Sequence, residues 1–175
     1  MRQPLDHSQV ELQFVSLRSK TAALLACDHD LAGPAVAFKT TETLRATANR
    51  CADLAETAQA TAPTFALSHL VAAQSAMTLG QLDLGRTHLE RSRTYARFEG
   101  WLAQKRFVLS LRNNLPTATS DVQTLLSTQF GTEFLARHYL ANPALRDTIG
   151  TAALDMNGHI QQRLLNLLTK YRAGA

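Results

Sequence analysis

The chain has 175 residues, 45% of them hydrophobic, and a formal net charge of +4 at pH 7. A chain of this length buries about two-thirds of its unfolded surface, so its hydrophobic core can stabilise the fold without a metal ion or a disulfide. It contains no glycine-rich phosphate loop, CxxC pair or HExxH motif, so we expect no enzyme, no metal site and no cofactor.

Ala and Leu dominate the composition, while Gly and Pro are sparse. Because Ala and Leu lose the least free energy on entering a helix, the sequence predicts an all-α fold. We expect a single domain over residues 1–175, built as an antiparallel bundle of about six to seven helices. The first helix should begin near Asp6 or Ser8 and end at residues 27–30.

The two cysteines, Cys27 and Cys51, are predicted to be unpaired. Cys51 lies on a helical face with Ala48 and Ala55, as a small buried hydrophobe does. Residues 1–6 lack the apolar core of a signal peptide. We therefore expect a reducing compartment, the cytoplasm.

The second helix should run from Pro34 to Ala60, although the β-branched residues of 40–43 fit a helix poorly. An uncharged window over residues 57–82 follows it. Polar side chains and Pro63 interrupt this window, so it predicts a helix buried on most sides and no membrane span.

Four further features divide the second half of the chain. Gly100 should kink or end the helix that precedes it, and residues 113–119 read as a loop. Ser120 and Asp121 should cap the next helix. The last helix, at about residues 159–172, carries apolar side chains at i, i+4, i+7, i+8 and i+11 from Ile160.

The third and fourth helices, residues 64–79 and about 83–97, form a predicted hairpin. Small residues at turn spacing allow close helix approach, and leucines fill the seam. Residues 66–93 resemble a single tetratricopeptide-type helix pair. The matching positions are Ala73, Gly80, Leu82, Gly85, Leu89 and Ser92. The resemblance implies a repeat of 34 residues, but the pattern does not recur one period away on either side.

The same hairpin also reads as a helix-turn-helix. Ala76 and Gly80 are spaced as in that motif, with Thr87, Leu89 and Arg91 on a basic second helix that could enter a major groove. Arg86, however, falls near a position where this second helix should turn an apolar side chain inward.

The whole positive excess lies in one segment, residues 86–112. It carries seven basic residues against Glu90 and Glu99. Aromatic residues alternate with the cations, and this combination suits nucleic acid and acidic protein surfaces equally. We therefore predict a partner-binding face made of Arg86, Arg93, Arg97, Trp101, Lys105 and Arg106. The alternative is that the aromatic residues lie in the core and that the arginines only form a solvent-exposed face.

The sequence favours a non-enzymatic helical adaptor or regulatory protein that binds an acidic protein partner through this face. A small nucleic-acid-binding regulator is the alternative. Self-association as a homodimer through the C-terminal helix is a further expectation, although the same leucine stripe can pack on its own bundle.

Overall fold

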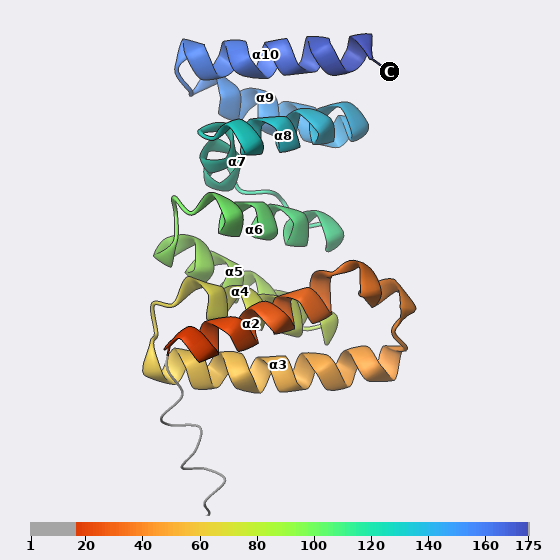
Figure 1. Cartoon of the computed structure of the whole chain (residues 1–175), viewed down its shortest axis with the longest axis vertical. Coiled ribbons are helices and arrows are strands. Elements are labelled where there is room, and N and C mark those ends of the chain that lie inside the picture. The colour runs from red at the N-terminus through yellow and green to blue at the C-terminus, as the bar shows by residue number, and fades with distance from the viewer. Residues whose placement is uncertain (1–16, 175) are drawn as a thin grey trace, which may run out of the picture. The chain divides into compact units, whose positions relative to one another are not determined.

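A computed structural model describes residues 17–174, and over this range the chain is all-α, as predicted (Figure 1). The described residues form nine α-helices and two short 3-10 helices, more than the six to seven helices expected, because tight turns divide the C-terminal half. The elements are α2 (Leu17–Ala32), η2 (Pro34–Phe38), α3 (Thr41–Thr61), α4 (Ala66–Thr78), α5 (Leu82–Tyr95), α6 (Gly100–Arg112), α7 (Thr119–Leu126), α8 (Gln129–Ala141), η3 (Pro143–Leu145), α9 (Arg146–Leu154) and α10 (Gly158–Ala173).

The end of the first helix and the extent of the second differ from the prediction. The expected start near Asp6 or Ser8 lies outside the described residues, and α2 continues past residues 27–30 to Ala32. The predicted second helix is divided. Thr40 has an extended backbone, and its hydroxyl accepts a hydrogen bond from the Thr43 amide (3.2 Å), so it caps the N-terminus of α3.

The helices α4 and α5 form the predicted hairpin. Every residue from Ala66 to Met77 is buried, which confirms the helix enclosed on most sides. Gly80 ends the turn with a φ of +82°, a conformation that costs glycine little. A Cβ on Gly85 would stand 3.3 Å from the Ala73 carbonyl oxygen and closer still to Met77. The small residue at position 85 therefore permits close approach of the two helices.

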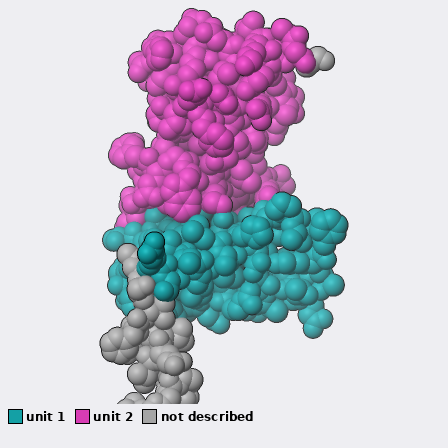
Figure 2. Space-filling model, viewed as in Figure 1, with its two compact units in different colours: residues 1–88 teal, residues 89–175 magenta. Residues whose placement is uncertain are grey.

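The chain divides into two compact units, residues 1–88 and 89–175, with the division inside α5 (Figure 2). In the first unit α2, α3 and α4 pack against one another (Figure 1). None of the helices within residues 17–174 is long and apolar enough to cross a membrane.

A disulfide between Cys27 and Cys51 joins α2 to α3, with Cα atoms 5.7 Å apart. Both cysteines are buried, as expected for Cys51, but the prediction that they are unpaired is wrong. Cys27 was expected at a helix end, whereas α2 continues beyond it and presents it to α3. Beside the bridge, the Gln74 amide donates a hydrogen bond to the buried Asp28 carboxylate (2.8 Å) and so connects α4 to α2.

The second unit has its own hydrophobic core. Phe107 of α6, Leu126 of α7, Leu135 of α8 and Ile149 of α9 are almost fully buried in it. The C-terminal helix presents Ile160, Leu164 and Leu168 to the same core. The leucine stripe of α10 therefore packs on its own bundle, and a homodimer through that stripe has no support from its burial.

A matched pair of glycine substitutions tests the packing of α8 against α7. A Cβ on Gly131 would stand within 3 Å of the Leu125 backbone, which has no room to move, whereas a Cβ on Gly150 of α9 would meet nothing within 4 Å. We expect Gly131→Ala to lower the free energy of unfolding by about 2 kcal/mol. Gly150→Ala should raise it by about 0.5–1 kcal/mol, because alanine favours the helix. Denaturant titration measures both, and equal effects would contradict the close approach at Gly131.

Candidate partner-binding surface

The six predicted site residues do not lie on one helix. Arg86 belongs to the first unit, where it is exposed and lies 3.4 Å from the Asp83 carboxylate. The other five belong to the second unit. Arg97 was expected on the same helix as Arg86 and Arg93, but α5 ends at Tyr95.

Two of the predicted cations, Arg93 and Arg106, converge on one buried carboxylate, Asp121 of α7. The Arg106 Nε and Nη2 atoms lie 2.9 and 2.7 Å from Asp121 Oδ1. The Arg93 Nε and Nη2 atoms each lie 3.1 Å from Asp121 Oδ2. Arg106 is fully buried (0% exposed), and the Asp121 side chain is only 2% exposed. We call these three residues the charge cluster.

The charge cluster corrects part of the predicted face. Arg106 has no accessible guanidinium, so it cannot contact a partner directly, and Arg93 is only 12% exposed. Burial disfavours the charge of Arg93, but its hydrogen bond to Glu90 and the attraction of Asp121 outweigh burial and raise its pKa above the ordinary value. Arg93 therefore stays charged at any physiological pH, and both arginines have a structural role.

Asp121 was expected as a helix cap, and this prediction is wrong. Ala118 occupies the N-cap position of α7 without a side-chain hydrogen bond, and Asp121 lies in the first turn. A carboxylate there also gains from the positive end of the helix dipole. The sequence carries one indication of this role of Asp121. Residues 86–112 contain many arginines and must also supply core residues, and an arginine that becomes buried requires a carboxylate partner.

Hydrogen bonds from the charge cluster and from α7 hold the backbone of the α5–α6 loop, residues 96–99. Arg106 Nη2 donates to the Ala96 carbonyl (3.3 Å), and the Thr124 hydroxyl of α7 lies 2.9 Å from both the Arg97 and the Ser120 carbonyl oxygens and shares its single proton between them. The Ala96 amide donates to the Ser92 carbonyl (3.1 Å), so the loop continues directly from α5. The loop backbone is therefore held from α5, α6 and α7 at once.

On this supported backbone the loop presents side chains that contact little of the unit. Phe98 is 84% exposed, and the Arg97 guanidinium carbon lies 5.6 Å from the centre of its ring, within cation–π distance. Trp101, in the first turn of α6, is 45% exposed. We call Arg97, Phe98 and Trp101 the loop surface. Lys105 is half-buried on α6, and Phe107 lies in the core, as the alternative interpretation held for the aromatics.

Other groups of chemical interest lie elsewhere. The buried His69 donates from Nε2 to the Pro63 carbonyl (2.8 Å), and its Nδ1 lies 3.4 Å from Nδ1 of His88. Within residues 17–174 no three side chains of His, Cys, Asp or Glu are placed to hold a metal ion.

No protein-family model, curated protein or solved structure matches this chain. The resemblance of residues 66–93 to a tetratricopeptide-type pair therefore stays a prediction. The surface has to be interpreted from its own chemistry.

Proposed function

We propose that the chain is a non-enzymatic helical adaptor or regulatory protein that binds an acidic protein partner through the loop surface. One observation carries the proposal. Phe98 is 84% exposed, yet it stands on a loop whose two preceding carbonyl groups are held by Arg106 and Thr124.

An exposed aromatic on a fixed backbone is a favourable binding element. When a partner covers a large apolar side chain, the burial favours binding. The entropy cost of ordering a flexible loop opposes binding. Here the ordering is done by the charge cluster before binding. Arginine and aromatic residues are also those most enriched among the residues that dominate interface energies.

The sign of the partner's charge follows from the accessible cations. Arg97 is exposed and lies within cation–π distance of the Phe98 ring, and no carboxylate is paired with it among the described residues. A carboxylate of the partner can pair with the guanidinium while an apolar side chain covers the two rings. We therefore expect an acidic surface that also carries an apolar side chain.

The arginine–aromatic pair also suits a single-stranded nucleic acid, whose bases stack on aromatic rings. Salt titration separates the two partners. Binding dominated by phosphate contacts weakens steeply with salt, with a log–log slope of about −0.7 per contact for single strands. Absence of binding to single-stranded and duplex DNA at low salt would exclude the alternative.

Phe98→Ala tests the loop surface against a matched control, Phe130→Ala. Phe130 is also an exposed phenylalanine of the second unit (67%) but lies on α8, outside the loop surface. We expect Phe98→Ala to weaken partner binding by about 2 kcal/mol, which is roughly thirtyfold. Phe130→Ala should leave it unchanged. Calorimetric titration of each variant with the identified partner measures the difference, and equal effects would remove the loop surface from the proposal.

The location of the protein is part of the same proposal. The expected cytoplasmic location depended in part on unpaired cysteines, and disulfides are rare in cytosolic proteins. The Cys27–Cys51 bridge instead favours an oxidising compartment.

A further inference from the structure

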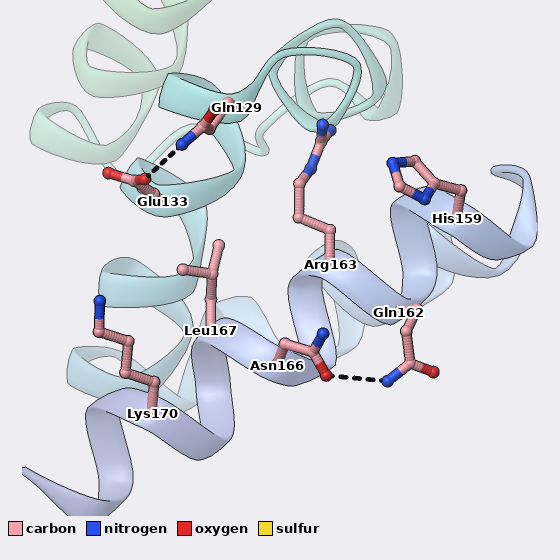
Figure 3. A pocket seen from close by; sticks show the side chains of 8 residues that line it. All are labelled: Gln129, Glu133, His159, Gln162, Arg163, Asn166, Leu167 and Lys170. Atoms are coloured by element: carbon pink, nitrogen blue, oxygen red, sulfur yellow. Dashed lines mark hydrogen bonds between the residues drawn. The ribbon is translucent and has the colours of Figure 1, made fainter.

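A second surface of the same unit, separate from the loop surface, is hollowed into a groove between α8 and α10 (Figure 3). Its volume is about 430 Å³, within the range of ligand-binding clefts. Gln129 and Glu133 of α8 form one wall, and α10 supplies the rest. Ile160, Leu164 and Leu168 of α10 face the core, whereas Leu167, which packs only partly against the core, also lines the groove.

The α10 side chains that line the groove follow one helical face. His159, Arg163, Asn166 and Lys170 stand at i, i+4, i+7 and i+11. At 1.5 Å per residue this row is about 16 Å long. An extended polypeptide rises about 3.3 Å per residue, so the row matches about five residues of an extended chain.

The charges of the groove are not neutralised from within the described part of the unit. Arg163 and Lys170 form no ion pair there with a carboxylate. The Arg163 guanidinium donates a hydrogen bond from Nη2 to the Leu126 carbonyl, and its buried Nε has no acceptor among the described residues. Most of its five N–H donors are therefore uncommitted. Two such cations against the single Glu133 favour an anionic ligand.

Two amide side chains add a pattern specific for a peptide backbone. Gln162 Nε2 donates to Asn166 Oδ1 (2.9 Å), as the dashed line in Figure 3 shows. This bond leaves the Gln162 carbonyl as an acceptor and the Asn166 amide as a donor. A peptide group presents the complementary N–H and C=O.

We propose that the α8–α10 groove binds an acidic segment of a partner protein in extended conformation. The peptide backbone pairs with Gln162 and Asn166, and carboxylates of the segment pair with Arg163 and Lys170. Glu133 disfavours a continuous polyanion such as nucleic acid, whereas a peptide can place an uncharged residue beside it. The groove does not use the loop surface, so this site stands whether or not the loop surface binds a partner.

The test uses the full chain and a fluorescent, end-blocked peptide of five alternating glutamate and alanine residues, with binding followed by anisotropy at low salt. We expect Lys170→Gln to weaken binding about fivefold, because one ion pair is lost. Arg172→Gln is the control. It makes the same charge change on an exposed residue of α10 that does not line the groove, and it should change affinity less than about twofold. Lys170→Arg should restore binding, and Glu133→Gln should strengthen it about threefold by removing repulsion.

Three results would overturn the site. The first is an equal effect of Lys170→Gln and Arg172→Gln, which would indicate only general charge attraction. The second is full competition by inorganic tripolyphosphate together with unchanged binding by Asn166→Ala, which would indicate an anion site without backbone recognition. The third is loss of binding of this peptide in Phe98→Ala but not in Lys170→Gln. That result would place the peptide on the loop surface and leave the proposed function intact.

Discussion

Asp121→Asn should lower the free energy of unfolding of the second unit by about 3–5 kcal/mol, the largest effect expected of any single substitution here. Asparagine has nearly the same shape, so the packing of α7 is preserved. It carries no charge, however, and leaves the fully buried Arg106 without a paired carboxylate among the described residues, while Arg93 keeps only its ion pair with the exposed Glu90. Desolvated cations without a counter-charge are among the most costly buried groups.

Trp101 provides the measurement, because it is the single tryptophan of the chain and lies in the second unit. Its fluorescence during denaturant titration follows this unit directly. Asp155→Asn is the matched control, since Asp155 is exposed and its carboxylate accepts a long hydrogen bond of 3.5 Å from the Gln123 amide. We expect the control to change the free energy by less than about 0.5 kcal/mol. A change below about 1 kcal/mol for Asp121→Asn would show that the cluster contributes little.

Removal of the disulfide should have the second-largest effect. The bridge closes a loop between residues 24 apart in sequence. In the chain-entropy model a loop of this length stabilises the folded state by about 3–4 kcal/mol. We therefore expect the double variant Cys27→Ala/Cys51→Ala to unfold at lower denaturant concentration by a corresponding amount.

Reductant supplies the control for the bridge. Dithiothreitol should destabilise the wild-type chain and have no effect on the double variant, as followed by far-ultraviolet circular dichroism. Thiol titration of the unfolded, unreduced protein should detect no free thiol. Two free thiols in that titration would contradict the bridge and return the cysteines to the unpaired state that the sequence predicted.

The helices could be predicted because their signals are local. The 3.6-residue spacing of apolar side chains in α10, the glycine at position 80 and the loop near residues 113–119 each act within a few residues. Their structural counterparts, α10, the left-handed turn at Gly80 and the break between α6 and α7, lie where they were expected. Short turns at residues 127–128 and 155–157 raised the number of helices above the prediction.

The pairings could not be predicted, because they join residues far apart in the sequence. Arg106 and Asp121 are separated by 15 residues, Arg93 and Asp121 by 28, and the cysteines by 24. Nothing in local periodicity distinguishes a buried arginine from an exposed one. The predicted face therefore mixed different kinds of cation: Arg93 and Arg106 of the charge cluster, Arg97 on the loop surface, Lys105 half-buried on α6, and Arg86 in the first unit.

The direct test of the loop surface is site-specific photo-crosslinking with benzoylphenylalanine at position 98, in extract of the native host. The control carries the same probe at Leu154, which is 76% exposed in the same unit. We expect a protein adduct that resists nuclease, forms at position 98 but not at 154, and is lost when Arg97→Gln is added. Identical adducts at the two positions, or none at position 98, would contradict a partner-binding role for the loop surface.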